Sequence, residues 1–256
     1  MELSNTVVVV TGAGSGIGEA IARRISKESP RGLVLADINS AAIERLGSEI
    51  GATPVVVDVS SEADNKRLID TATQLFGPID LFCANAGIGF LGDEQSESSE
   101  WERMWQINTM SHVYAARHLI PGWLSRGEGY FLSTASAAGL LTNLKAAQYS
   151  VTKHAAVAFS EWLAVTYGDR GIKVSCLCPM GVDTPLLDVD ADFRKLLEPD
   201  AIPAAAVAEA VVQGIRAEEF LILPHPEVRR YIQNKANDYD RWIGGMQKLQ
   251  RSVFPD

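Results

Sequence analysis

Apolar runs of strand length alternate with helical patterns along the first part of the chain. The runs at 6–10, 33–36 and 54–57 are rich in valine and leucine, and helical patterns fill about 17–29 and 40–50. This order is typical of a parallel sheet with right-handed crossovers and helices on both faces. We therefore expect an α/β fold with a doubly wound parallel sheet.

Four later apolar runs raise the expected number of strands to about seven, at 79–84, 129–133, 172–177 and 220–223. Between the first two of these runs, Ser99 and Glu102 have the spacing of a capping box. They predict a long helix that begins there, runs toward Arg117 or beyond, and ends ahead of Pro121.

Two segments toward the carboxyl end lie outside the alternation. Residues 185–203 contain several apolar side chains and no regular pattern, which indicates a mobile lid over a cleft. Residues 227–256 have apolar side chains at mixed helical spacing. They predict a C-terminal helical tail that packs on its own subunit, packs on a partner subunit, or walls the pocket.

Composition narrows the class of protein. A chain of 256 residues with 46% hydrophobic residues can form a full core, so we expect one domain over 1–256. The net charge of −9 argues against nucleic acid and anionic membranes as partners, because both favour a basic patch. No run resembles a signal peptide or a membrane span, which predicts a cytoplasmic protein.

Cysteine and histidine usage does not indicate a metal site. Cys83, Cys176 and Cys178 lie in or beside apolar runs, with neither metal-ligand spacing nor an even count. We interpret them as small core residues in a reducing compartment. The four histidines show no ligand spacing, so no metal is predicted.

A glycine-rich turn follows the first strand. Gly12, Gly16 and Gly18, with Ser15 and Ile17 between them, connect a strand to a helix. Glycines allow a sharp turn and a close backbone approach to a ligand, and the free N–H groups of the helix start favour a pyrophosphate.

An acidic residue follows the second strand. Asp37 lies nineteen residues after Gly18, where a carboxylate can accept hydrogen bonds from adenosine ribose hydroxyls and would repel a 2′-phosphate. Neither Ser15 nor Ile38 is the basic residue that a 2′-phosphate would need. The pattern favours NAD over NADP, with a solvated Asp37 as the alternative.

A tyrosine and a lysine share one predicted helix face. Tyr149 and Lys153 are four residues apart, and Ser136 lies thirteen residues before the tyrosine. A nearby ammonium group favours the phenolate, so we expect Lys153 to lower the pKa of Tyr149 and prepare it for proton transfer. Tyr231 and Lys235 repeat the spacing without the other motifs, and we interpret that copy as chance.

The motifs together resemble those of the short-chain dehydrogenase/reductase family of nicotinamide-dependent oxidoreductases. They are Thr11-Gly12-x-x-x-Gly16-x-Gly18, Asn85-Ala86-Gly87, Asn108, Ser136 and Tyr149-x-x-x-Lys153. The resemblance covers about 5–223 and implies a single-domain Rossmann-type fold with NAD as cofactor.

The resemblance implies further roles. Asn108 would hold a water that links Lys153 to solvent, and Asp58 with Val59 would contact the adenine ring. An additional or alternative role for Asp58 is to cap the helix that begins near Ser60. The other implied cofactor contacts are Asn85, Ala86, Gly87, Pro179, Val182 and Thr184, with the last two at the nicotinamide carboxamide.

Two positions depart from the family pattern. Ala84 replaces the first of two asparagines, which puts the hydrogen bonding of that turn in question, and Met180 replaces a glycine. A bulky Met180 would narrow the substrate entrance.

The helix expected over 147–167 carries the small residues Ala155, Ala156, Ala158 and Ala164. They allow another helix to approach closely, or they pack against the sheet. The family commonly pairs this helix between subunits, so the resemblance implies a homodimer or homotetramer.

These expectations favour an NAD-dependent dehydrogenase that interconverts a secondary alcohol and a ketone. Tyr149 as a phenolate would take the hydroxyl proton, Ser136 would stabilise the oxyanion, and Lys153 would bind the nicotinamide ribose. The expected pocket segments, 88–92, 137–143, 180–202 and part of the tail, suit a bulky apolar substrate such as a steroid, aromatic, alicyclic or lipid-derived alcohol. Two alternatives are an NADPH-dependent carbonyl reductase and a catalytically silent NAD-binding sensor or scaffold.

Overall fold

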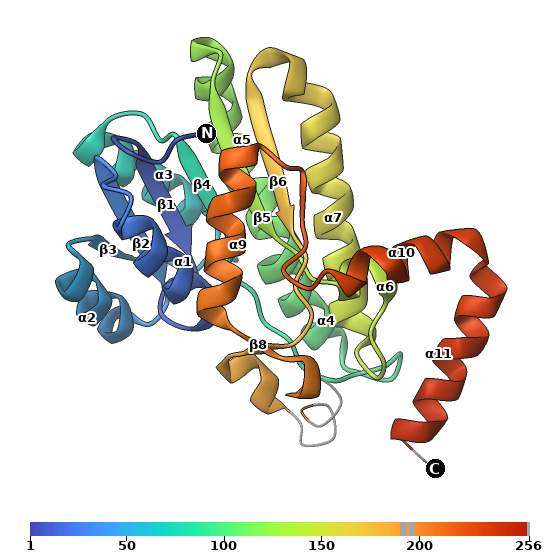
Figure 1. The fold of residues 1–256 in the computed structure, drawn as a ribbon. Coiled ribbons are helices and arrows are strands. Elements are labelled where there is room, and N and C mark those ends of the chain that lie inside the picture. Colours follow the sequence, from blue (N-terminus) through green and yellow to red (C-terminus); the bar gives the residue numbers. More distant parts are fainter. Residues whose placement is uncertain (190–193, 195–197, 255–256) are drawn as a thin grey trace.

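A parallel sheet of seven strands forms the centre of the protein (Figure 1). The computed structural model describes residues 1–189, 194 and 198–254. The strands are β1 (Val7–Thr11), β2 (Gly32–Asp37), β3 (Thr53–Val56), β4 (Leu81–Ala84), β5 (Gly129–Thr134), β6 (Ile172–Leu177) and β9 (Leu221–Ile222). Their order is β3-β2-β1-β4-β5-β6-β9, and every neighbouring pair is parallel. The expected doubly wound sheet is confirmed.

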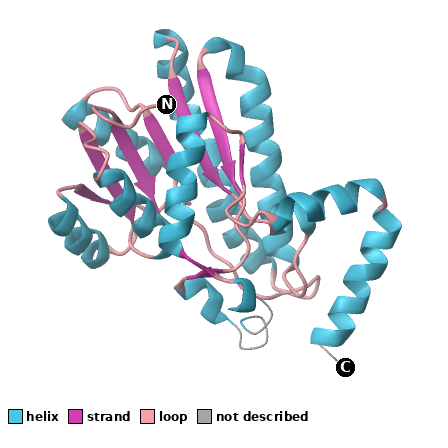
Figure 2. Cartoon of the chain, viewed as in Figure 1, coloured by secondary structure: helices cyan, strands magenta, loops and turns pink. Residues whose placement is uncertain are grey.

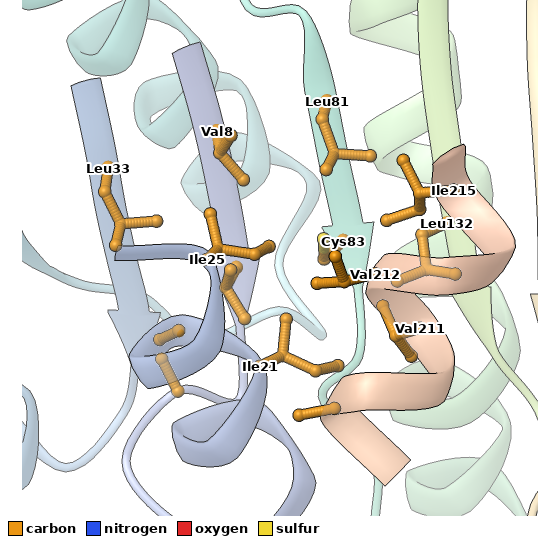
Figure 3. Close-up of a cluster of buried hydrophobic side chains, with 14 of the residues drawn as sticks. Val8, Ile21, Ile25, Leu33, Leu81, Cys83, Leu132, Val211, Val212 and Ile215 are labelled. Atoms are coloured by element: carbon orange, nitrogen blue, oxygen red, sulfur yellow. The ribbon is translucent and has the colours of Figure 1, made fainter. Parts of the chain in front are cut away.

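Helices cover both faces of the sheet (Figure 2). One face is packed by α1 (Gly16–Ser26), α2 (Ser40–Ile50) and α9 (Ala204–Ala217), and the other by α3 (Glu62–Phe76), α5 (Ser111–Arg126) and α7 (Ala147–Tyr167). In Figure 3, Ile25 of α1 lies beside Val8 of β1. Successive strand residues point to opposite faces, so Val7 and Val9 pack on the other side.

The order of the strands creates a crevice beside the centre of the sheet. From β1 the chain proceeds outward through β2 to β3 and then returns to the other side with β4. The connections after β1 and β4 therefore diverge to opposite sides, which leaves an opening at the carboxyl ends of these strands. The glycine-rich turn and Asn85 both lie there.

The predicted long helix does run beyond Arg117, but its capping box and its end ahead of Pro121 are wrong. α4 (Ser98–Trp105) begins one residue before Ser99, and no side chain caps it, so the capping box does not form. A π-helical segment, η1 (Gln106–Met110), separates α4 from α5, and α5 continues through Pro121 to Arg126. Because Ile120 and Trp123 are buried beside the proline, their packing outweighs the hydrogen bond that proline removes.

The carboxyl-terminal tail is helical, as expected, and forms two helices. Asp238 separates α10 (Glu227–Asn237) from α11 (Tyr239–Val253), and its side chain caps α11 by accepting a hydrogen bond from the Arg241 N–H. Figure 1 shows α11 standing away from the sheet, and no residue of α11 is buried.

Part of the predicted lid, 190–193 and 195–197, lies outside the described residues. The rest includes η3 (Pro185–Val189), η4 (Glu198–Asp200) and β8 (Ile202–Pro203), which pairs with β7 (Val182–Asp183). Within the described ranges, none of the helices combines the length and the apolar character needed to cross a membrane.

Candidate active site

One cavity brings the predicted cofactor residues together. Its volume is about 630 Å³, and its walls include every predicted cofactor residue from Gly12 to Thr184, together with Ser136. The volume is within the usual range for small-molecule sites. Asn108 is the one predicted site residue that does not line it.

The glycine-rich turn closes tightly against the turn after β4. Gly12 has a φ of +65°, and a Cβ atom on it would lie 2.7 Å from the Cα atom of Ala86. A Cβ atom on Gly18 would collide with the carbonyl of Gly12. A larger residue at Gly12 would therefore push the turns after β1 and β4 apart, and one at Gly18 would push α1 away from the glycine-rich turn.

The start of α1 can accept an anionic ligand. Its N-cap, Ser15, makes no side-chain hydrogen bond to the helix. The first N–H groups of a helix have no partner within the helix, and Gly16 and Ile17 at this helix start line the cavity. This donor set fits the pyrophosphate of a dinucleotide.

Asp37 has a structural role that the sequence did not reveal. Its Oδ2 atom accepts a 2.9 Å hydrogen bond from the Gly14 N–H, and its Oδ1 atom accepts one of 2.9 Å from the Asn39 N–H. A carboxylate has about four acceptor positions, so it retains capacity for ribose hydroxyls. Its neighbour Ile38 is 71% exposed at the cavity rim.

The proposed N-cap role of Asp58 is wrong. Ser61 caps α3 by accepting a hydrogen bond from the Asp64 N–H. Asp58 instead accepts hydrogen bonds from the N–H and the hydroxyl of Ser60, at 2.9 and 2.7 Å. Asp58 and Val59 both line the cavity, in positions that fit an adenine contact.

Thr11 joins the ends of β1 and β4. Its hydroxyl accepts hydrogen bonds from the N–H groups of Asn85 and Ala86, at 3.0 and 3.1 Å, and donates to the Cys83 carbonyl at 3.2 Å. The backbone of this turn is thus well bonded although Ala84 stands where the family usually has asparagine. Apart from its place in the motif, nothing in the sequence marks this role of Thr11.

Ser136, Tyr149 and Lys153 meet at the cavity from two elements. Ser136 follows β5, and its hydroxyl accepts a 3.1 Å bond from the Ala138 N–H and lies 3.4 Å from the Pro179 carbonyl. Tyr149 and Lys153 are one turn apart on α7. Lys153 is 3% exposed, and its ammonium donates a 3.0 Å hydrogen bond to the Thr134 carbonyl and lies 5.7 Å from the centre of the Tyr149 ring.

The prediction that Lys153 lowers the pKa of Tyr149 is wrong for this geometry. Burial of the phenol raises the pKa of Tyr149 above its ordinary value, and only the Ser136 hydroxyl acts in the opposite direction. The ammonium is bonded to the Thr134 carbonyl, and Lys153 is not among the groups that shift the pKa of Tyr149. Burial also lowers the pKa of Lys153 to about 8.

Asn108 supports the cavity from behind. Its Oδ1 atom accepts from the Ile88 N–H, its Nδ2 atom donates to the Ile88 carbonyl, and both distances are 2.9 Å. A third hydrogen bond, of 3.2 Å, reaches the Thr152 hydroxyl. The fully buried amide lies in the π-helical segment η1 and fixes the chain beside Gly87. Its predicted water contact remains a prediction.

The tail supports the cavity without lining it, so the expectation that part of it forms the pocket wall is wrong for the described residues. Val228 of α10 is buried against Ala137 and Leu141, which do line the cavity. Lys235 donates a 2.7 Å hydrogen bond to the Leu140 carbonyl. This lysine, from the second Tyr-x-x-x-Lys copy, thus has a structural contact outside the cavity.

The comparisons with known sequences agree on one family. The family model described as short chain dehydrogenase matches residues 6–194. The chain is 31% identical over 252 residues to 1-deoxy-11-beta-hydroxypentalenate dehydrogenase of Streptomyces exfoliatus, which covers 95% of this chain and 91% of that protein. It is 33% identical over 190 residues to 3beta-hydroxysteroid dehydrogenase 2 of Eggerthella lenta, covering 71% of this chain and 73% of that protein.

Solved structures lead to the same result. A short chain dehydrogenase/reductase from Burkholderia phymatum in complex with NAD has a TM-score of 0.86 and 29% identity, covering 94% of this chain and 96% of that one. A 3-ketoacyl-(acyl-carrier-protein) reductase from Brucella melitensis complexed with NADH has a TM-score of 0.80 and 31% identity, covering 86% and 96%. The chain therefore belongs to the short chain dehydrogenase family of oxidoreductases.

Proposed function

We propose that this protein is an NAD-dependent dehydrogenase that interconverts a secondary alcohol and a ketone. The observation that carries the proposal is the meeting of Ser136, Tyr149 and Lys153 in the cavity that also holds the glycine-rich turn and Asp37. Proton-transfer groups and dinucleotide-binding groups in one cavity are what hydride transfer to or from an alcohol carbon requires.

The residues divide the chemistry between them. Tyr149 takes the proton of the alcohol during oxidation and returns it during reduction. Ser136 donates a hydrogen bond to the substrate oxygen, where negative charge develops. Lys153 holds the nicotinamide ribose and keeps a positive charge beneath the tyrosine. Bound NAD would supply the hydride acceptor and, in its oxidised form, a second positive charge near Tyr149.

Different residues of the cavity would hold different parts of the dinucleotide. The helix start at Gly16 and Ile17 suits the pyrophosphate, Asp37 suits the adenosine ribose, and Val182 with Thr184 suits the nicotinamide carboxamide. We assign the preference for NAD to the Asp37 carboxylate, which would repel a 2′-phosphate. The complexes of the two related structures with NAD and NADH support this assignment.

The substrate end of the cavity is largely apolar. The side chains that form it include Phe90, Leu91, Leu141, Met180 and Leu186. Such walls favour a bulky apolar alcohol of the steroid, aromatic, alicyclic or lipid-derived kind. The names of two relatives, a hydroxypentalenate and a hydroxysteroid dehydrogenase, support this class.

Initial rates with purified protein test the proposal. A panel of bulky secondary alcohols with NAD should give NADH absorbance, and the matching ketones should consume NADH. Faster ketone reduction with NADPH than with NADH would favour the carbonyl reductase alternative. Tight NADH binding without turnover of any alcohol or ketone in the panel would favour the sensor or scaffold.

We also propose that α7 forms a contact between subunits of a homodimer or homotetramer. Val151, Trp162 and Val165 of α7 are exposed, with Val165 85% exposed. Of the four alanines considered above, Ala156 is buried in the core and Ala158 is exposed. An apolar face with small residues on one helix fits the same face of a second copy.

A further inference from the structure

His225 joins the carboxyl-terminal part of the chain to the loop after β6. Its side chain is 2% exposed and lies between β9 and α10. The Met180 N–H donates a 3.2 Å hydrogen bond to Nδ1, and Nε2 lies 3.1 Å from the Gly181 carbonyl oxygen. Both ring nitrogens therefore contact successive residues of one loop, 44 and 45 positions away in the sequence.

These partners determine the state of the ring. A backbone N–H can only donate and a carbonyl can only accept, so Nδ1 must be unprotonated and Nε2 must carry the hydrogen. One neutral tautomer alone satisfies both contacts. With both nitrogens engaged, the ring fixes the direction of the peptide between Met180 and Gly181.

The two contacts differ in importance. The Gly181 carbonyl also accepts a 3.1 Å hydrogen bond from the Ile202 N–H. Within the described part of the chain, the Met180 N–H has no acceptor besides His225. Loss of the imidazole would leave this N–H unpaired, whereas Gly181 would keep a partner.

The loop that His225 holds forms one end of the cavity. Pro179, Met180, Val182 and Thr184 line the cavity, and His225 does not. The Pro179 carbonyl is held separately, by a 2.8 Å hydrogen bond from the Ala137 N–H. His225 therefore acts on the site through the backbone of residues 180 and 181.

We propose that His225 is a positioning residue that aligns this loop with the nicotinamide half of the cofactor. The inference rests on the proposed function, because it presumes that Val182 and Thr184 hold the carboxamide. It assigns to His225 no contact with substrate, cofactor or reacting atoms. Met180 stands where the family usually has glycine. The hydrogen bond from its N–H to the distant His225 side chain fixes its backbone conformation.

Binding of two ligands tests the proposal. NADH spans the whole site, while ADP-ribose lacks the nicotinamide. In H225F, which keeps the ring shape without hydrogen bonds, NADH should bind about tenfold more weakly, as the loss of a buried hydrogen bond predicts. ADP-ribose should bind as it does to the wild type. Fluorescence titration measures the affinity for NADH, and calorimetry measures the affinity for ADP-ribose.

Two conservative variants separate the contacts. H225N places an amide oxygen near the position of Nδ1 and keeps an acceptor for Met180, while H225Q keeps only a donor for Gly181. H225N should recover most of the NADH affinity and H225Q little, with melting temperatures confirming that both are folded. Equal NADH affinities for H225N and H225Q would overturn the proposal. Parallel weakening of NADH and ADP-ribose in H225F, or no weakening, would also overturn it. Wild-type protein that binds neither ligand would refute the proposed function instead.

Discussion

The Lys153 ammonium lies 5.7 Å from the centre of the Tyr149 ring while donating its 3.0 Å hydrogen bond to the Thr134 carbonyl. The ammonium is thus bonded to a backbone carbonyl, and within the described residues no hydrogen bond joins it to the Tyr149 hydroxyl. Because burial raises the pKa of Tyr149, the protein groups alone disfavour the phenolate that would act as the base. We infer that the tyrosine acts as a base once the cationic cofactor is beside it.

Removal of the Tyr149 hydroxyl separates catalysis from binding. Y149F should lower kcat by about 10²–10⁴-fold, the usual contribution of a positioned acid–base group, because no proton acceptor remains. NADH affinity should stay close to that of the wild type. Stopped-flow turnover and NADH fluorescence measure the two quantities.

The second Tyr-x-x-x-Lys copy provides the matched control for this experiment. Y231F removes a phenol hydroxyl at the same spacing from a lysine, outside the cavity. Its kcat should equal that of the wild type. Retained turnover in Y149F would remove the proposed base from the mechanism.

Removal of the Asp37 charge should relax the choice of cofactor. In D37N, kcat/KM with NADP relative to that with NAD should rise by about tenfold or more, because a charged hydrogen-bond acceptor for the ribose is lost. The asparagine oxygen still accepts from Gly14 or Asn39, so most of the stability should remain. D37A also loses those bonds and should melt at a lower temperature. An unchanged cofactor ratio in D37N would mean that another group selects NAD.

Burial of Lys153 makes stability depend on pH. The pKa of Lys153 is about 8 in the folded protein against 10.5 for an unperturbed lysine, so the folded state binds this proton less tightly. Between these values the unfolded chain holds more protons, and stability therefore rises with pH. Below pH 8 the full cost of the buried ammonium is present.

The variant K153M removes the free-energy cost of burying the Lys153 ammonium. At pH 7 its free energy of unfolding should exceed that of the wild type by about 1–3 kcal/mol, although its turnover should be lost. The difference should shrink as the pH approaches 10.5, which urea unfolding at several pH values measures. A difference that does not change with pH would contradict the assigned shift in the pKa of Lys153.

The proposed subunit contact on α7 predicts a change in assembly. W162E and V165E place charges on the exposed apolar face and should convert a dimer or tetramer to smaller species in sedimentation equilibrium. I243E on α11, at a position that is also exposed, is the matched control and should leave assembly unchanged. Assembly that persists in both α7 variants would exclude this helix as the contact.

Several parts of the site were predictable from local patterns. The valine run of β1, the glycines after it and Asp37 after β2 each mark a strand end. In a doubly wound sheet the carboxyl ends of parallel strands meet at one edge, so residues distant in the sequence come together without any contact being known in advance. The same reasoning placed Ser136 beyond β5, where the cavity lies.

Other features depend on packing between elements. The π-helical segment at Asn108 and the passage of α5 through Pro121 depart from local rules, because buried contacts outweigh backbone preferences there. The direction of the pKa shift of Tyr149 depends on how much water surrounds its hydroxyl. The spacing of residues in the sequence does not show how deeply the Tyr149 hydroxyl is buried.

The sequence alone determined the alternation of strands and helices, the family motifs and their arrangement at one edge of the sheet, since these follow from short-range periodicity and from the topology of parallel strands. Only the tertiary structure decided which carbonyl the Lys153 ammonium binds, which backbone groups His225 holds, and that the tail packs behind the cavity wall. Those outcomes depend on hydrogen bonds and burial between residues up to 95 positions apart, which no local pattern encodes.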